Sequence, residues 1–169
     1  MVAVFDTAFH QTMPKESYMY PIPYEYYEKY GIRKYGAHGT SHKYVAHEVA
    51  KILNKNISEL KIITCHLGQG ASITAIKNGI SIDTSMGLTP LGGIPMVTRS
   101  GDLDPSVVTY IMEKEDISPK EMETILNKKS GRLGLCGIGD QRKLMQAEAA
   151  GDKQAKLARK VQTHRNKKY

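Results

Sequence analysis

The feature that most constrains the fold is a block of three short apolar segments between residues 61 and 84. The segments are Lys61–Leu67, Ala71–Lys77 and Ile80–Thr84, and they are rich in the β-branched residues that favour strands. Asn78-Gly79 separates the second segment from the third, and both residue types tolerate the positive φ that a two-residue hairpin turn requires. We therefore expect three successive antiparallel strands.

Helices are predicted on both sides of the strands. Ser41 is a possible cap for a helix over 41–54, and Ser118 followed by Pro119 at the first helical position opens a helix that reaches about residue 129. Further helical patterns cover about 105–115 and, with a break at Gly151-Asp152, the stretch 141–164.

Two other segments read as irregular. Residues 131–139 hold four glycines in nine positions, which predicts a loop. Residues 11–35 combine three prolines with seven tyrosines and read as an extended arm followed by a short helix. Acidic residues are interleaved with these tyrosines, so burial in packing or at an interface explains them better than stacking on nucleic-acid bases.

Composition predicts an ordinary globular protein of the cytoplasm. No apolar run approaches the roughly 20 residues that cross a bilayer, and the start lacks the basic region of a signal peptide. Cys65 and Cys136 are far apart and have no metal-ligand spacing, which favours free thiols in a reducing compartment.

The net charge of +7 is confined to the end of the chain. Residues 141–169 carry nine Lys or Arg against two acids, whereas residues 1–140 carry fifteen of each. The body of the protein therefore lacks the charge pattern of a nucleic-acid binder. Two interpretations of the last 29 residues stay open. They are either a basic module that binds nucleic acid or an anionic surface, or a helix whose charged face is simply solvated.

A glycine-containing turn between the first two predicted strands is the first candidate site. His66-Leu67-Gly68-Gln69-Gly70 could bring backbone N–H groups against phosphate oxygens, because Gly68 and Gly70 have no Cβ to obstruct the approach. A plain hairpin turn is the competing interpretation. The segment matches neither a Rossmann fingerprint nor a Walker sequence.

Four further residues carry candidate chemistry. His38 and His42 are spaced like a zinc pair, but no glutamate follows His38 and no third ligand stands nearby, which argues against a metal site. Arg99, in a Gly- and Pro-rich loop, suits either a salt bridge or neutralisation of charge on a phosphoryl group. Asp6 suits either a turn cap or a carboxylate that organises a metal or nucleophile.

Five ordered segments together resemble the acetate kinase (acetokinase) family. The segments are Val4–Pro14 (VFDTAFHQTMP), Tyr35–His42 (YGAHGTSH), His66–Gly70 (HLGQG), Asp83–Gly87 (DTSMG) and Thr98–Asp102 (TRSGD). The resemblance implies an incomplete α/β domain of the actin/hexokinase-like (ribonuclease H-like) type, a mixed sheet with antiparallel β-hairpins flanked by helices. It places residues 1–10 at the end of a first domain and residues 11–169 in the first part of a second, nucleotide-binding domain.

The resemblance also implies the activity and the site. The family transfers a phosphoryl group in line between ATP and acetate, with Mg²⁺, giving ADP and acetyl phosphate. The resemblance further implies a cytoplasmic homodimer that engages neither nucleic acid nor membrane. Asp6 matches its catalytic aspartate, and His38 and Arg99 match the residues that stabilise the transferring group. Nucleotide contacts are expected from His66, Leu67, Gly68, Gln69, Gly70, Asp140, Gln141 and Arg142, and no residue of the chain is assigned as a metal ligand.

Departures from the family pattern qualify these expectations. Ala37, Gln69 and Val97 replace the usual Phe, Asn and Gly, and the loop before Asp140 is one residue shorter. The small Ala37 makes propionate or butyrate the runner-up substrate. The family's first phosphate loop, upstream arginine, adenosine loop and late glutamate are not found in these 169 residues, so we expect this stretch of chain alone to have little or no activity.

Overall fold

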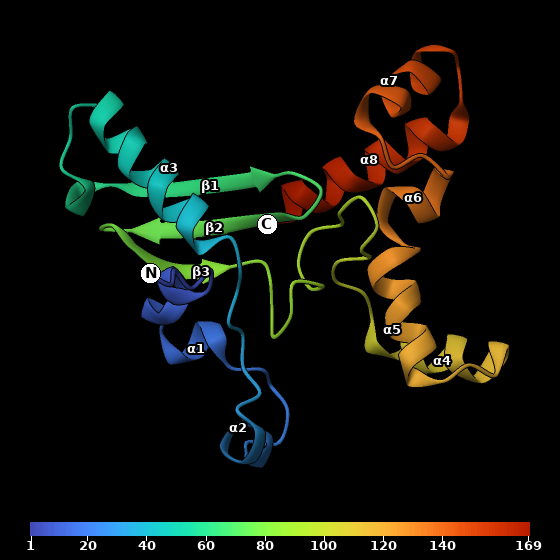
Figure 1. The fold of residues 1–169 in the computed structure, drawn as a ribbon, viewed down its shortest axis with the longest axis horizontal. Coiled ribbons are helices and arrows are strands. Elements are labelled where there is room, and N and C mark those ends of the chain that lie inside the picture. Colours follow the sequence, from blue (N-terminus) through green and yellow to red (C-terminus); the bar gives the residue numbers. More distant parts are fainter. The chain divides into compact units, whose positions relative to one another are not determined.

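The three predicted strands form one antiparallel sheet, in the order β1 (Lys61–Leu67), β2 (Ala71–Lys77) and β3 (Ile80–Thr84) (Figure 1). The pairing of β1 with β2 runs in regular register from Lys61 opposite Lys77 to Leu67 opposite Ala71. Asn78 (φ 55°) and Gly79 (φ 80°) both have positive φ at the turn into β3. The hairpin predicted from Asn-Gly is thus confirmed.

The computed structural model describes residues 1–169, and these residues form two compact units. Unit 1 comprises Met1–Leu67 and Ala71–Gly92, and unit 2 comprises Gly68–Gly70 and Gly93–Tyr169. All three strands belong to unit 1, whereas the three-residue turn between β1 and β2 belongs to unit 2.

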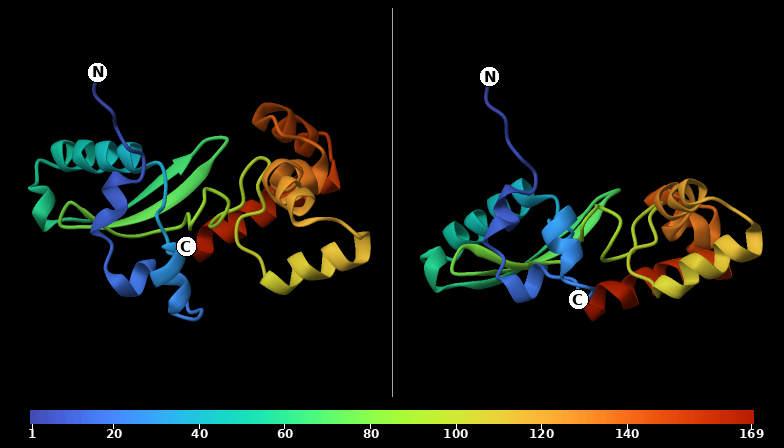
Figure 2. Two further views of the ribbon diagram at one scale, coloured as in Figure 1. Left: turned by 60° about the horizontal axis from the view of Figure 1, so that its bottom comes forward. Right: turned by 90° about the horizontal axis from the view of Figure 1, so that it is seen from below.

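Helix α3 covers one face of the sheet of unit 1 (Figures 1 and 2). The elements of unit 1 outside the sheet are the 3₁₀ helices η1 (Ala8–Thr12) and η2 (Ile57–Glu59) and the α-helices α1 (Lys15–Tyr18), α2 (Glu25–Tyr30) and α3 (Gly39–Ile52). The arm predicted over 11–35 therefore carries two short helices. Its tyrosines are partly packed, since the Tyr18 and Tyr27 rings stack with centroids 6.1 Å apart and the Arg33 guanidinium lies 3.6 Å from the Tyr18 centroid.

The start of α3 corrects one prediction. The helix begins at Gly39, and its N-cap is His38 in the left-handed conformation (φ 59°, ψ 21°), not Ser41. The Asp6 carboxylate, 32 residues away, accepts a hydrogen bond from the His38 backbone N–H. A partner so distant in sequence replaces the local cap that Ser41 was expected to supply.

The sheet face that packs under α3 and η1 is polar and buried. Thr64, Ser72, Thr74, Ser81 and Thr84 are all at most 4% exposed. Buried hydroxyl groups need hydrogen-bond partners, and several of these partners are histidines. The opposite face of β1 is apolar and open, with Ile63 at 67% and Leu67 at 63% exposure.

Unit 2 is helical. Its elements are α4 (Pro105–Glu115), α5 (Pro119–Lys128), α6 (Gly131–Cys136), α7 (Gln141–Ala149) and α8 (Lys153–Lys168), with α6 and α7 both packed against α8. The predicted cap of α5 is confirmed, because Ser118 and Glu121 form a reciprocal capping box. The break at Gly151-Asp152 is confirmed as well.

The loop predicted over 131–139 is wrong in its first two-thirds, which form α6. Tertiary hydrogen bonds stabilise this glycine-rich turn: the N–H groups of Arg132 and Leu133 donate to the carbonyls of Met96 and Val97, at 3.1 and 2.9 Å. Gly131 has φ 60°, and a Cβ there would lie 2.3 Å from the Met96 carbonyl oxygen. A poor local helix former is thus held in a helix by its surroundings.

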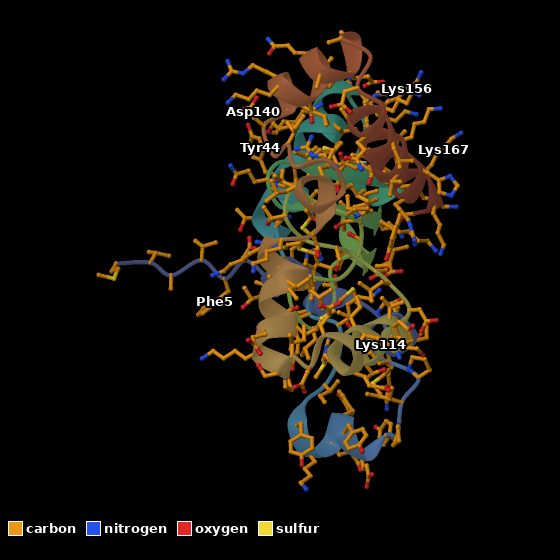
Figure 3. All side chains as sticks on the ribbon, turned by 90° about the vertical axis from the view of Figure 1, so that its right-hand side faces the viewer. Phe5, Tyr44, Lys114, Asp140, Lys156 and Lys167 are labelled. Carbon is orange, nitrogen blue, oxygen red and sulfur yellow. The ribbon has the colours of Figure 1, made fainter.

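The basic residues of the last 29 positions lie mainly on α8, where Lys156 and Lys167 are exposed (Figure 3). Arg159 forms a two-pronged ion pair with Glu148 of α7, at 2.5 and 2.6 Å. None of the helices is both long enough and apolar enough to span a membrane.

Candidate active site

Asp6 and His38 meet at the N-terminus of α3. The His38 backbone N–H donates to Asp6 Oδ2 at 2.6 Å, and the Gly39 N–H donates to the Asp6 carbonyl at 2.8 Å. A Cβ at position 39 would lie 2.4 Å from that carbonyl oxygen, so only glycine permits the approach. These contacts fix the left-handed backbone of His38 and hold Asp6 beside it.

His66 joins His38 from the end of β1. The two imidazole rings stack with centroids 4.0 Å apart and an interplanar angle of 18°. His66 Nδ1 lies 3.0 Å from Ser41 Oγ, so Ser41 orients this ring instead of capping the helix. Two of the predicted site histidines are therefore side by side.

His42, one helical turn after His38, lies fully buried beneath this pair at 1% exposure. Its Nδ1 lies 2.7 Å from Thr64 Oγ1, and its Nε2 lies 2.7 Å from Ser72 Oγ. The same Ser72 hydroxyl lies 2.9 Å from His38 Nδ1. Burial, and then the charges of the neighbouring histidines, lower the pKa of His42 from 6.5 to about 4.

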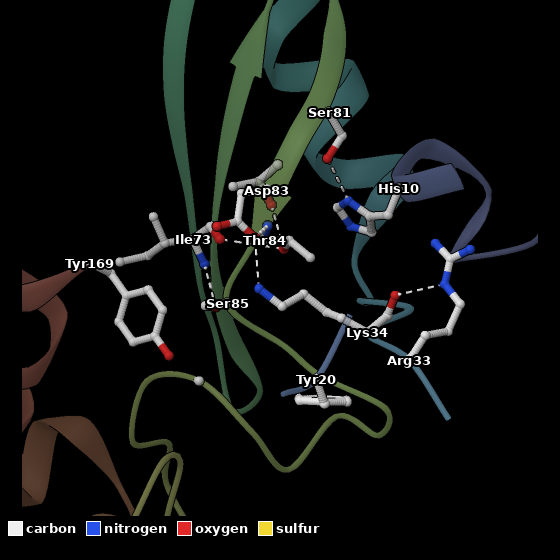
Figure 4. Close-up of polar contacts among 12 residues, drawn as sticks. His10, Tyr20, Arg33, Lys34, Ile73, Ser81, Asp83, Thr84, Ser85 and Tyr169 are labelled. Atoms are coloured by element: carbon white, nitrogen blue, oxygen red, sulfur yellow. Dashed lines mark hydrogen bonds and ion pairs between the residues drawn. The ribbon is translucent and has the colours of Figure 1, made fainter. Parts of the chain in front are cut away.

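His10 supports the loop before His38. It is completely buried, and its Nε2 donates to the Ala37 carbonyl at 2.9 Å. Its Nδ1 accepts from Ser81 Oγ at 2.9 Å (Figure 4). A carbonyl can only accept, so this contact assigns the hydrogen to Nε2. Burial lowers the pKa of His10 and keeps the ring neutral.

Sequence reasoning missed the roles of His10, His42, Ser72 and Thr64. The sequence suggested a role for His42 only as a partner of His38 in a zinc pair. In the structure, no set of three or more His, Cys, Asp or Glu side chains in residues 1–169 is arranged to hold a metal ion. The alternation along β1 and β2 was the available signal, because it places polar side chains at 64, 66 and 72 on one face.

Apart from Leu67, the other predicted site residues belong to unit 2. In the turn Gly68–Gly70, Gly68 N–H donates to the Gly70 carbonyl at 3.0 Å, and the Gln69 carbonyl accepts from Val97 N–H at 3.4 Å. Arg99 lies in the same loop, two residues after Val97. Its Nη1 lies 3.4 Å from Met96 Sδ. Leu67, the last residue of unit 1 before this turn, is largely exposed.

Asp140, Gln141 and Arg142 stand at the start of α7. Asp140 is the N-cap of this helix, and its Oδ1 accepts from Lys143 N–H at 2.9 Å. Gln141 and Arg142 are exposed in the first turn. A capping role therefore accounts for Asp140 in this structure, and the nucleotide contact expected of these three residues stays a prediction.

The solved structures that match this architecture include kinases of small carboxylic acids. Over 98% of this chain and 42% of the neighbour's, it matches the acetate kinase of Porphyromonas gingivalis (TM-score 0.96, 48% identity) and a propionate kinase from Francisella tularensis (TM-score 0.94, 55% identity). The model of the acetokinase family matches residues 1–169, and the chain belongs to this family. The α/β fold class implied by the sequence is thereby confirmed.

Curated relatives agree with this assignment. The acetate kinase of Thermoanaerobacterium thermosaccharolyticum is 65% identical over 99% of this chain, and that of Dictyoglomus turgidum is 60% identical over 99%. The chain spans 42% of the length of each.

Proposed function

We propose that this chain is part of an acetate kinase, which transfers a phosphoryl group between ATP and acetate. The single observation that supports this most strongly is the constrained His38 at the start of α3, held by Asp6, Gly39 and the stacked His66. A donor held this rigidly suits the stabilisation of charge on a transferring phosphoryl group, because preorganised donors need no reorganisation during the reaction.

The proposed reaction is a direct in-line transfer. An acetate oxygen attacks the γ-phosphorus of ATP, the bond from that phosphorus to the bridging oxygen breaks, and ADP leaves with the bonding electrons. Acetate is already ionised, so no general base is required. In this scheme His38 and Arg99 donate hydrogen bonds to the equatorial oxygens, and the turn of His66, Leu67, Gly68, Gln69 and Gly70 approaches the nucleotide phosphates.

Magnesium fits this scheme as an ion held mainly by the nucleotide. Mg²⁺ is usually bound by one or two carboxylates together with substrate phosphates, and Asp6 is the acidic side chain beside His38. Its Oδ2 accepts from the His38 N–H, and Asp6 would be the residue of this stretch of chain that helps to hold the ion. When bound, Mg²⁺ would offset the negative charge of the phosphates.

The wider assignments are also part of the proposal. Residues 1–10 would end a first domain and residues 11–169 would begin a second, nucleotide-binding one, in a cytoplasmic homodimer that uses ATP and ADP. Asp140, Gln141 and Arg142 would contact the nucleotide.

Propionate is the second candidate substrate. Ala37 is 7% exposed and small, beside the loop that carries His38, and a structural neighbour 55% identical to the chain is named a propionate kinase. One methylene changes discrimination by only about 1–3 kcal/mol, so both acids are expected to react, at different kcat/KM.

Trapping of acyl phosphate as a hydroxamate by the intact protein tests the proposal. We expect product with acetate, and a loss of about 10²–10³ in kcat for His38→Ala. His47→Ala is the matched control, because His47 lies on the same helix but is exposed and outside the cluster. No acyl phosphate from acetate, propionate or butyrate, or equal rates for the two variants, would refute the proposal.

A further inference from the structure

Three hydrogen bonds link four side chains from α3, β1 and β2. His38 Nδ1 lies 2.9 Å from Ser72 Oγ, Ser72 Oγ lies 2.7 Å from His42 Nε2, and His42 Nδ1 lies 2.7 Å from Thr64 Oγ1. Ser72, His42 and Thr64 are 0%, 1% and 4% exposed. The chain of bonds therefore starts in the protein interior and ends on the ring of His38.

The number of hydrogens restricts how these bonds can run. A hydroxyl group has one hydrogen to donate, and a neutral imidazole has one N–H and one accepting nitrogen. Ser72 stands between two ring nitrogens and can donate to only one of them. With His42 neutral, all three bonds form if every hydrogen points from Thr64 toward His38, or if every hydrogen points the opposite way. They also form if Ser72 accepts from both rings, but the hydrogen of Ser72, which is 0% exposed, would then be buried without an acceptor.

Thr64 distinguishes these two arrangements. Its hydroxyl makes no hydrogen bond except the one with His42. If the hydrogens run toward His38, the Thr64 hydrogen is used in that bond. If they run the other way, Thr64 only accepts, and its own hydrogen is buried without an acceptor, which proteins avoid because such a group has lost its bond to water.

His42 is neutral at ordinary pH, as this reasoning requires. Burial is the main cause of its low pKa of about 4, and the charges of His10, His38 and His66 lower it further, while Asp6 opposes them. His66 also disfavours the cationic form of His38, because two rings stacked at 4.0 Å would repel each other if both were cationic.

We propose that Thr64, His42 and Ser72 are positioning residues that hold neutral His38 in the tautomer with its hydrogen on Nε2. Thr64 donates to His42 Nδ1, His42 Nε2 donates to Ser72, and Ser72 donates to His38 Nδ1. His38 then carries its hydrogen on the ring nitrogen that must donate to a phosphoryl oxygen, and it does so as a neutral imidazole. This consequence for catalysis rests on the proposed function; the tautomer itself does not.

Long-range ¹H–¹⁵N spectra of the intact protein labelled in histidine test the proposal directly. At about pH 8, above the ordinary histidine pKa of about 6.5, we expect His38 and His42 each to show protonated Nε2 and unprotonated Nδ1. His10 is the internal reference, since its bond to the Ala37 carbonyl assigns the hydrogen to Nε2. Protonated Nδ1 on either His38 or His42, or a tautomer average on either ring, would overturn the proposal.

Paired substitutions at position 64 test the origin of the effect. Thr64→Val keeps the shape and removes the hydroxyl, and we expect a protonated Nδ1 population to appear on His42. Thr64→Ser keeps the hydroxyl and should keep the wild-type pattern. Thr74→Val is the matched control, because Thr74 is a buried threonine of β2 that bonds to Thr84. A purely structural role predicts more disturbance from Thr64→Ser than from the isosteric Thr64→Val, and that result would refute the proposal.

Kinetics separate this inference from the proposed function. If both hydrogen-bond directions become equally populated in Thr64→Val, the competent fraction halves, and kcat falls about twofold. The expected tautomers together with an undiminished rate for His38→Ala would refute the role of His38 in catalysis and leave the positioning inference intact. Wrong tautomers with a large loss in His38→Ala would do the opposite.

Discussion

Protonation of buried His42 is expected to make unit 1 sensitive to mild acid. In the folded state the ring is enclosed by α3 and the sheet, and its pKa is about 4, whereas an unfolded chain gives the ordinary value of 6.5. Above pH 6.5 both states hold a neutral ring, and the stability is fully present. As the pH falls toward 4 the unfolded state takes up a proton that the folded state does not, so the free energy of unfolding decreases.

The magnitude follows from the two pKa values. The difference between 6.5 and about 4, at about 1.36 kcal/mol for each pKa unit, amounts to a loss of about 3 kcal/mol between pH 7 and pH 4. His10 acts in the same direction, because burial lowers its pKa as well. A loss of this size is a large part of the 5–15 kcal/mol that is typical of whole domains.

Tyrosine fluorescence provides an assay that reports mainly on unit 1. The chain has no tryptophan, and eight of its ten tyrosines lie within residues 1–92. Urea unfolding would be followed at several pH values for the wild type, for His42→Gln, and for His47→Gln as the exposed control on the same helix. His42→Gln should be less stable than the wild type at pH 7, and this difference should shrink by about 3 kcal/mol at pH 4.

The comparison between variants is needed because other groups also titrate in this range. A stability difference between His42→Gln and the wild type that stays constant within about 1 kcal/mol from pH 7 to pH 4 would refute the reasoning. A similar pH dependence of the difference for His47→Gln would refute it too, since that ring is exposed.

Two further substitutions test particular contacts. Arg132→Met should raise the free energy of unfolding of unit 2 by about 1–3 kcal/mol. The reason is that the guanidinium is buried, its Nε has no hydrogen-bond partner, and its Nη2 makes only a long 3.3 Å bond to the Gly139 carbonyl. A lower free energy of unfolding, measured by urea unfolding with circular dichroism, would contradict this. Gly39→Ala should lower the stability of unit 1 by about 1–3 kcal/mol, because its Cβ would meet the Asp6 carbonyl oxygen at 2.4 Å, and an unchanged unfolding midpoint by tyrosine fluorescence would show that the backbone yields freely.

Local chemistry made a large part of the fold predictable. The Asn78-Gly79 turn and the Ser118 cap depend on side chains within a few residues of the backbone groups that they satisfy, so the sequence contains the whole interaction. The same holds for the helix break at Gly151-Asp152. The three strands were predictable because their β-branched runs are bounded by turn residues.

Elements stabilised by distant partners were not predictable in this way. Helix α6 forms because carbonyls some 36 residues earlier accept its first N–H groups, which outweighs the low helix propensity of its glycines. The true start of α3 depends on Asp6, and the sequence offered Ser41 as a plausible local cap instead.

The candidate site divides along the same line. The sequence by itself determined the family and singled out Asp6, His38 and His66 as candidates, because these stand in motifs that can be read one segment at a time. Only the tertiary structure decided how they are held: the stacking of His66 on His38 and the bonds from Thr64 through His42 and Ser72 join residues on three elements. The physical reason is that a hydrogen bond depends on distances of about 3 Å and on which atom has a hydrogen to donate, and folding brings those atoms together.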